Sequence, residues 1–330
     1  MLRLTRRRTF KSAVFLCLCL LPPLTGAAQN SRTATFCSYN VKNWLLQHSS
    51  QPDTQPPFHK SDSEKRRVIE FLTQIRPDIL GLCEIGLPSD LAEIQALLRA
   101  AGIDLPHSEM AGGGDPTRAL GLLSRFPITS RNSQTDLHYQ MGRQTLPMQR
   151  GILDVTIDLR PKFAVRFVGV HLKSKRAIAE ADESMMRRNE AHLLRRHLDS
   201  IFAATPDARV VCYGDFNEHR NSPAIAEIIG SRASPGHMAD VYLRDEAGLV
   251  WTHFWDEADV YSRFDYLFVS RIMRTYVDSG NCHIFSAADF HRASDHRPVV
   301  LALKKLPPLI PATPNPASAP AAVEAPASAQ

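Results

Sequence analysis

The sequence has no apolar run near its start that is long enough to cross a bilayer as a helix of the finished protein. Residues 13–24 are apolar but too short, a basic head precedes them, and small residues stand at 26–28 before Gln29. This pattern predicts a cleaved export signal at residues 1–28, with an uncleaved anchor as the alternative. Arg7-Arg8-Thr9-Phe10 also resembles a twin-arginine signal, so the export route stays open. We expect a bacterial protein exported to the periplasm or the cell exterior, with no membrane span left after cleavage.

An excess of charge of either sign is also missing from the predicted mature chain. The whole sequence has 39 Lys and Arg against 34 Asp and Glu, a formal net charge of +5. The predicted signal holds five basic residues and no acidic ones, so the two kinds are equal in number after it. Overall charge therefore gives no argument for a nucleic-acid partner, and such binding would have to come from local patches.

Cysteine is scarce, and its spacing excludes a zinc site of the usual kind. Of the 6 cysteines, Cys17 and Cys19 lie in the predicted signal. The others, each expected inside a strand, are Cys37, Cys83, Cys212 and Cys282. We expect them to be small buried hydrophobic residues, and a disulfide is the alternative in an oxidising compartment.

The body of the chain, residues 29–305, is long enough for one large core, and no internal repeat divides it. Three helical patterns lie at residues 61–75, 89–101 and about 179–202. Three polar loops are expected at residues 47–60, 106–118 and 131–149. Met185 and Met186 of the third helix are expected to pack in the core. Residues 306–330 are rich in Pro and Ala and predict an extended, mobile tail.

One stretch, Val210-Val211-Cys212-Tyr213-Gly214-Asp215-Phe216-Asn217, organises the rest of the chain. An apolar strand runs into a glycine, and Asp215 and Asn217 follow two residues apart. Alternate residues of an extended segment face the same way, so both side chains can project past the strand end. A carboxylate beside an amide can hold a water, a metal or a phosphate oxygen, although Gly-Asp-x-Asn also forms ordinary turns.

Four other apolar strands carry a polar or ionisable residue at one end. These residues are Asn40, Glu84, His171 and the pair Asp295 and His296. A core strand has no structural use for such residues at its end, whereas a site built at strand ends does.

The order of these motifs resembles the endonuclease/exonuclease/phosphatase superfamily, the metal-dependent phosphoesterases typified by deoxyribonuclease I. The resemblance covers residues 34–305. It includes the segments Ser38-Tyr39-Asn40, Leu82-Cys83-Glu84, Gly169-Val170-His171-Leu172, Gly214-Asp215-Phe216-Asn217, Phe264-Asp265-Tyr266-Leu267 and Ser294-Asp295-His296-Arg297-Pro298. It implies an α/β fold, a four-layer sandwich of two packed, mostly antiparallel β-sheets flanked by helices.

The resemblance also implies a role for each strand-end residue. Glu84 is the main ligand of a Mg²⁺ or Mn²⁺ ion, with Asn40 close by and Asp295 as a further ligand. Asp215 orients and deprotonates the attacking water, and Asn217 holds the water or a phosphate oxygen. His296 and His171 contact the phosphoryl group. Asp265 lies inside an apolar strand, where a carboxylate needs a partner, and His296 is the expected one.

Candidates for substrate binding are weaker. Arg150 precedes a strand and could bind phosphate or form a rim salt bridge, and Lys173 and Lys175 follow His171. Trp251, His253 and Trp255 are aromatic residues for which core packing and base stacking are both open.

Together these features predict an exported metal-dependent phosphodiesterase that hydrolyses DNA or RNA. The alternatives are the same chemistry on a phospholipid, a phosphoinositide or a small phosphomonoester, and an inactive binding protein on this fold. The sequence implies no protein partner.

Overall fold

The structure is a computed structural model that describes residues 32–47, 58–178 and 181–308. The predicted export signal and nearly all of the predicted tail lie outside the described residues. Among the described residues, no helix combines the length and the apolarity that a membrane span requires.

Two six-stranded sheets pack face to face at the centre of the fold. The strands of the first are, in order across the sheet, β17 (His283–Ile284), β18 (Val299–Leu303), β1 (Ala34–Trp44), β4 (Ile79–Ile85), β6 (Ala119–Ser124) and β5 (His107–Ala111). Those of the second are β13 (Met238–Asp240), β16 (Asp265–Ser270), β12 (Val210–Asp215), β11 (Phe163–His171), β10 (Leu153–Arg160) and β7 (Ile128–Arg131). Each sheet has one parallel pair, β1 with β4 and β11 with β12, among antiparallel neighbours.

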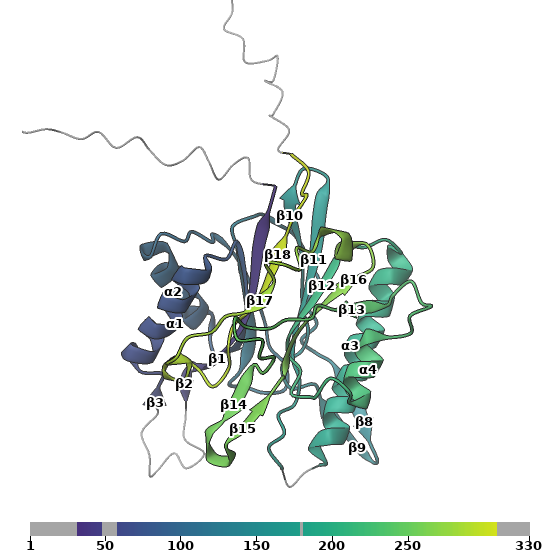
Figure 1. Cartoon of the computed structure of the whole chain (residues 1–330). Helices are drawn as coiled ribbons and strands as arrows, with labels where there is room; N and C mark the ends of the chain where they lie inside the picture. The colour runs from purple at the N-terminus through teal and green to yellow at the C-terminus, as the bar shows by residue number, and fades with distance from the viewer. Residues whose placement is uncertain (1–31, 48–57, 179–180, 309–330) are drawn as a thin grey trace, which may run out of the picture. The chain divides into compact units, whose positions relative to one another are not determined.

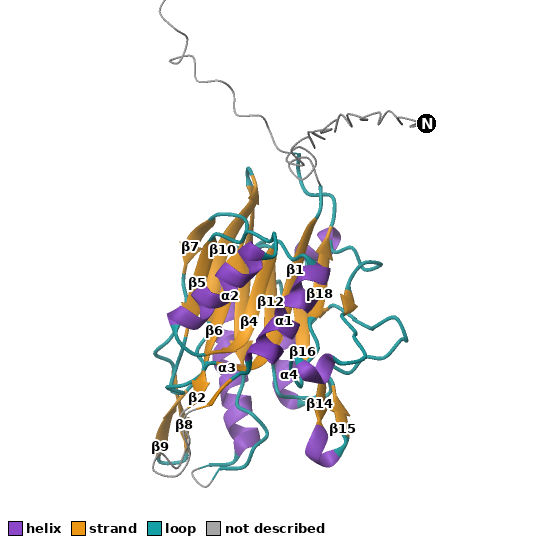
Figure 2. Cartoon of the chain, turned by 90° about the vertical axis from the view of Figure 1, so that its left-hand side faces the viewer, coloured by secondary structure: helices purple, strands orange, loops and turns teal. Residues whose placement is uncertain are grey.

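Helices cover the outer face of each sheet. Figure 1 shows α1 (Asp62–Ile75) and α2 (Pro88–Ala100) on one side of the sheets, and α3 (Glu183–Ala204) and α4 (Pro223–Ile229) on the other. Figure 2 shows α1 and α2 lying across the sheet that contains β4. One apolar cluster fills the space between the sheets and two others join each sheet to its helices. The predicted four-layer sandwich is therefore confirmed.

The local signals of the first helix are borne out in detail. Ser61 caps α1: its Oγ accepts the N–H of Glu64 at 3.3 Å, and Glu64 Oε2 accepts the N–H of Ser61 at 2.9 Å. Arg76 ends the helix in a left-handed conformation, directly before Pro77. The third helix begins later than expected, at Glu183, because Asp182 caps it.

Several sequence predictions were wrong. All three expected loops contain strands: β3 (Phe58–His59) lies in 47–60, β5 lies in 106–118, and the hairpin of β8 (His138–Met141) and β9 (Gln144–Pro147) lies in 131–149. Strands β5, β8 and β9 are polar and lie at sheet edges or in a separate hairpin, so they lack the apolar alternation of a buried strand. Helix α4 was not predicted, and Met185 is 56% exposed although Met186 is buried.

The four cysteines of the described chain are buried and free, as expected for small hydrophobic residues. Cys282 differs from the prediction in one respect: it lies just before the strand β17 and not inside a strand.

The packing of one tyrosine between the two sheets depends on two glycines. Tyr213 of β12 lies between the sheets, and a Cβ on Gly81 of β4 would lie 2.2 Å from its ring. A Cβ on Gly169 of β11 would lie 2.6 Å from the Tyr213 hydroxyl. Side chains at both positions are therefore excluded by the packing of one buried aromatic residue.

We expect Gly81→Ala to lower the free energy of unfolding by about 1–3 kcal/mol, because the added methyl group overpacks the core at Tyr213. Urea unfolding of Gly81→Ala, Tyr213→Leu and the double variant measures this cost. The loss of unfolding free energy caused by Gly81→Ala should be smaller in a protein that also carries Tyr213→Leu. An equal loss with and without Tyr213→Leu would contradict the proposed contact.

Candidate active site

The crossover connections bring the carboxyl ends of four strands to one rim of the sandwich. Helix α1 joins the parallel strands β1 and β4, and α3 joins β11 and β12. Parallel strands joined in this way end at the same edge of their sheet. Strand β16 is antiparallel to β12 and β18 is antiparallel to β1, so both begin at this rim. The rim therefore collects Asn40, Glu84, His171, Asp215, Asp265 and His296.

Three strands of the second sheet place their polar ends side by side. His171 is paired with Asp215, and Asp215 with Asp265, in the register of the sheet. All three side chains are almost completely buried. Gly214 makes this possible: its φ is +135°, and a Cβ there would lie 1.9 Å from the carbonyl oxygen of Val170.

The segment after Asp215 turns back on that carboxylate. Asn217 has a φ of 51°, and its N–H donates to Asp215 Oδ1 at 2.9 Å. The Asn217 side chain donates through Nδ2 to the carbonyl oxygen of Leu172 at 3.0 Å. Asn217 therefore orients Asp215 and fixes the chain after His171 in one turn.

Asp265 and His296 form the ion pair expected from the cost of burying Asp265. His296 Nδ1 donates to Asp265 Oδ2 at 2.8 Å. Burial alone would lower the pKa of His296, but the Asp265 and Asp215 carboxylates outweigh it and raise that pKa to about 10. At neutral pH the ring is an imidazolium whose Nε2 lies 3.5 Å from Asp215 Oδ2.

Asn40 links the two sheets at this rim. Its Nδ2 lies 3.1 Å from Glu84 Oε1 and 3.1 Å from Asp215 Oδ2. Ser294, two residues before His296, donates to the Asn40 carbonyl oxygen at 2.8 Å. One amide thus connects the carboxylate of the first sheet with that of the second.

Glu84 lies at an irregularity in its strand. The register of β4 shifts between Cys83 and Ile85, and Glu84 has a left-handed φ of 67°. Its Oε2 accepts the N–H of Asn43 at 2.9 Å. A glutamate in this conformation is strained, and such strain is typical of functional positions.

The donor set of the rim fits a hard divalent cation. Asp215, Asp265 and His296 each have a ligand atom within 4.8 Å of the others. Burial raises the pKa of Asp215, His296 opposes this, and the nearby Asp265 and Glu84 carboxylates raise it further. Oxygen donors of this kind suit Mg²⁺ or Mn²⁺, although the protonated His296 is unsuited to be a ligand.

Of the ligands expected from sequence, Asn40 and Glu84 lie in direct contact. Asp295 is half-buried beside them; its Oδ1 accepts the hydroxyl of Ser294 at 3.3 Å. The assignment of Glu84, Asn40 and Asp295 as the metal ligands stays a prediction.

His171 and Arg150 lie on the other side of Asp215. His171 Nε2 is 3.5 Å from Asp215 Oδ2. Burial first, and then the charges of Arg150 and His296, hold the pKa of His171 well below its usual range, so this ring is neutral. Arg150 is buried and pairs with Asp115 at 3.0 Å, while its Nε and Nη1 have no hydrogen-bond partner among the described residues. A buried guanidinium with two spare donors suits an anionic oxygen.

Sequence reasoning missed Asp115 and Arg118. Asp115 Oδ2 lies 3.0 Å from Arg150 and 3.8 Å from Arg118 Nη1. Arg118 donates through Nε to Asn43 Oδ1 at 2.7 Å and lies 3.9 Å from Glu84 Oε2. The triple glycine before Asp115 was the available signal, because a Cβ on Gly113 would lie 2.5 Å from the Met148 carbonyl oxygen. This loop packs on the segment that carries Arg150.

Glu190 of α3 was also missed. It is fully buried, and its two carboxylate oxygens accept the N–H groups of Gln149 at 2.9 Å and Lys173 at 2.6 Å. It therefore ties together the segments that carry Arg150 and His171. The only signal in the sequence was its place in a predicted helix, three residues after Arg187.

The two lysines expected to bind substrate already have partners. Lys173 Nζ donates to the carbonyl oxygens of Ser174 at 3.2 Å and Arg176 at 3.1 Å. Lys175 lies 3.4 Å from Glu218 Oε2. Their contribution to substrate binding stays a prediction.

Comparison with known proteins places this geometry in a family. The sequence matches the Endonuclease/Exonuclease/phosphatase family over residues 37–296, and no curated protein matches. The fold is similar to an endonuclease/exonuclease/phosphatase family protein from Bacteroides thetaiotaomicron (TM-score 0.55, 18% identity, 82% of this chain and 94% of that chain).

It is also similar to sphingomyelinase C from Streptomyces griseocarneus (TM-score 0.56, 16% identity, 82% of this chain and 99% of that one). A third similar structure is a humanized D. rerio TDP2 with 14 mutations (TM-score 0.55, 20% identity, 83% and 100%). At these identities the structures establish the fold alone. The family match covers most of the chain and includes every strand-end residue described above, and the protein therefore belongs to the endonuclease/exonuclease/phosphatase family.

Proposed function

We propose that the protein is an exported, divalent-metal-dependent phosphodiesterase that hydrolyses nucleic-acid phosphodiester bonds by in-line attack of an activated water. The observation that carries the proposal is the contact chain at the rim. Asn40 joins Glu84 to Asp215, and Asp215 lies beside the His296 imidazolium, which Asp265 holds in place.

In this mechanism Asp215 is the general base. Its buried position favours the protonated form, so it is suited to accept a proton from the attacking water. The Asn217 N–H bond to Oδ1 leaves Oδ2 facing the centre of the rim, toward Asn40, His171 and His296.

Hydrogen-bond donors on both sides of Asp215 stabilise the negative charge that develops on the phosphoryl oxygens. His296 donates from Nε2 while its Nδ1–H stays bonded to Asp265, which fixes the orientation of the ring. Neutral His171 donates from Nε2, and Arg150 offers its two spare donors. Such preorganised donors stabilise the transition state more than the ground state.

Glu84, with Asn40 and Asp295, would hold the Mg²⁺ or Mn²⁺ ion, which supplies positive charge to the phosphate and to the leaving oxygen. Arg118, 3.9 Å from Glu84 Oε2, would add a second positive charge beside the ion for the anionic substrate.

A second candidate substrate is a phospholipid or sphingomyelin. The hairpin of β14 (His253–Trp255) and β15 (Val260–Ser262) lies next to the site, because the Phe254 N–H donates to the Asp295 carbonyl oxygen at 2.9 Å. Trp255 and Tyr261 are each 53% exposed, and Val260 is 44% exposed. Exposed apolar side chains beside a phosphoesterase site favour a lipid surface, and they equally suit stacked bases.

We expect Asp215→Asn to lower kcat by about 10²–10⁴-fold, because the amide cannot accept the proton of the attacking water. Chelation of divalent metal should abolish the wild-type activity, and added Mg²⁺ or Mn²⁺ should restore it. Steady-state hydrolysis of bis(p-nitrophenyl) phosphate measures both effects, with urea unfolding as the control for folding. Turnover near the wild-type value in Asp215→Asn would disprove the mechanism.

Arg150→Ala should lower kcat/KM by about 10- to 100-fold, because a charge-assisted contact to the phosphate is lost. Arg125→Ala is the matched control, since Arg125 pairs with Asp78 at 2.9 Å and has no contact with the rim residues. If the Arg150→Ala and control proteins have equal kcat/KM values, Arg150 does not contact the phosphate and has a structural role only.

Substrate choice is measured with plasmid DNA, single-stranded RNA and sphingomyelin vesicles. The proposal expects cleavage of nucleic acid, and it expects a Trp255→Ser/Tyr261→Ser variant to retain hydrolysis of bis(p-nitrophenyl) phosphate. Cleavage of vesicle lipid with intact nucleic acid, lost in the same variant, would replace the first candidate by the second.

A further inference from the structure

A hollow of about 530 Å³ lies along the outer edge of the second sheet, at its terminal strand β13. Met238, Ala239 and Ile229 form its apolar floor. Four arginines line it, and we name them together the arginine groove: Arg220, Arg232, Arg271 and Arg274. They come from three separate parts of the sequence, so only the fold brings them together.

The positive charge of this groove is largely uncompensated. Among the described residues, Arg232 and Arg274 have no side-chain hydrogen bond or ion pair, and Arg271 donates only to the Arg232 carbonyl oxygen at 3.2 Å. Asp240 is the carboxylate of the lining, and it already pairs with Arg220 at 2.8 Å and with Arg263 at 2.7 Å. Clustered guanidinium groups without acidic partners raise the local concentration of anions.

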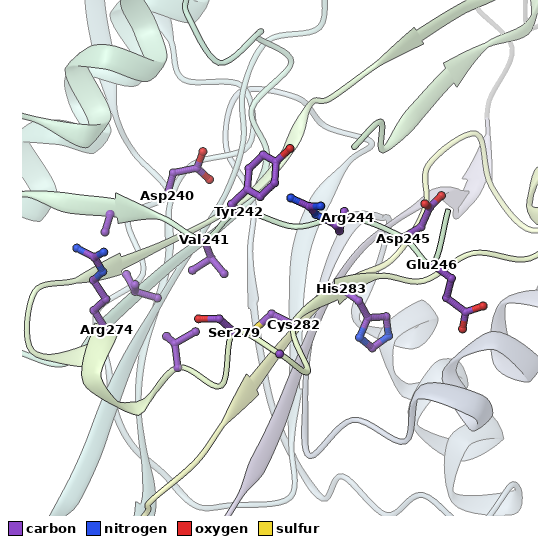
Figure 3. Close-up of a pocket in the computed structure, with 14 residues that line it drawn as sticks. Asp240, Val241, Tyr242, Arg244, Asp245, Glu246, Arg274, Ser279, Cys282 and His283 are labelled. Carbon is purple, nitrogen blue, oxygen red and sulfur yellow. The ribbon is translucent and has the colours of Figure 1, made fainter. Parts of the chain in front are cut away.

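The neighbouring hollow provides a contrast. Its volume is about 640 Å³, and it shares Ala239, Asp240 and Arg274 with the arginine groove. Figure 3 shows Asp240 and Arg274 at one end of it, and Asp245, Glu246 and His283 at the other. Its lining mixes both signs of charge, so it suits a polyanion less well than the arginine groove does.

The strand β16 connects the candidate active site with the region of the arginine groove. Arg220 follows Asn217 by three residues, and its partner Asp240 is paired with Phe268, three residues along β16 from Asp265. Met238 is paired with Ser270, directly before Arg271. The five-residue span of β16 from Asp265 to Ser270 corresponds to about 17 Å, so a strand of several nucleotides is needed to reach from the candidate active site to the far end of the groove.

We propose that the arginine groove binds the phosphate backbone of a nucleic-acid strand whose scissile bond lies at Asp215. This inference rests on the proposed function and names a second contact region for the same substrate. Guanidinium groups bind phosphate in a bidentate manner, and such contacts position a strand without reading its sequence. A strand of phosphates can follow the hollow and contact several of its exposed guanidinium groups in turn.

The test is binding, measured separately from cleavage. Fluorescence anisotropy with a labelled single-stranded oligonucleotide of about 20 nucleotides, in chelator, compares the wild type with the triple variant Arg232→Glu/Arg271→Glu/Arg274→Glu. The control variant carries the same charge change on exposed helix positions elsewhere, Arg66→Glu/Arg188→Glu/Arg196→Glu. Circular dichroism and urea unfolding confirm that both variants are folded.

We expect the groove variant to raise the Kd at least tenfold over the control. The slope of log Kd against log[NaCl] should fall by about two, because each phosphate contact contributes about 0.7 for a single strand. Hydrolysis of bis(p-nitrophenyl) phosphate, which is too small to reach the groove, should stay unchanged in both variants.

Equal oligonucleotide affinity in the two variants would overturn the inference and leave the proposed function intact. Wild-type protein that binds phosphatidylserine vesicles but no oligonucleotide would overturn it in favour of a membrane. Absence of bis(p-nitrophenyl) phosphate hydrolysis by the wild-type protein with metal present would instead reject the proposed function, because that readout does not involve the groove.

Discussion

Buried carboxylates at the ends of the strands are the constraint on which the rest of the site depends. Asp215 and Asp265 are almost completely buried, and Glu84 reaches Asp215 through the Asn40 amide. Burial without compensation would be too costly, and the protein supplies part of the compensation through His296 and the Asn217 N–H. The pKa of Asp215 is nevertheless raised, first by burial. The remaining excess of negative character favours a cation, and a cation in turn favours an anionic substrate.

Topology explains why these groups meet although they are far apart in the sequence. Each sheet contains one parallel pair formed by a helical crossover, and the two pairs end at the same rim. Tyr213 of the second sheet packs against Gly81 of the first, and Gly169, its neighbour in the second sheet, leaves room for the ring. A change in that packing would move Asn40 and Glu84 relative to Asp215. Core geometry and site geometry are therefore coupled through a single aromatic residue.

The sequence predicted the part of the site that follows from buried strands. Apolar runs that end at Asn40, Glu84, His171 and Asp215 are visible because strand burial imposes a pattern, and the first helix is marked by its capping box. Asp115, Arg118 and Glu190 could not be found in this way, because they act from a loop and a helix: Asp115 and Arg118 contact distant side chains, and Glu190 contacts distant backbone N–H groups. Polar edge strands such as β5 were missed for a different reason. Most of their side chains are only partly buried, so their sequence lacks the apolar pattern of a core strand.

Chemistry at the scissile bond and choice of substrate have different structural origins in this protein. In the proposed mechanism the rim around Asp215 requires only a phosphoester, since its donors and carboxylates act on one phosphoryl group. A substrate with a single phosphate does not span the distance from the rim to the far end of the arginine groove, because about 17 Å of β16 lies between Asp265 and Ser270. A chain of phosphates can contact both. The equal numbers of acidic and basic residues after the predicted signal therefore do not exclude a local excess of positive charge, such as that of the arginines along the β13 edge. A local excess of this kind is what the proposed polyanionic substrate requires.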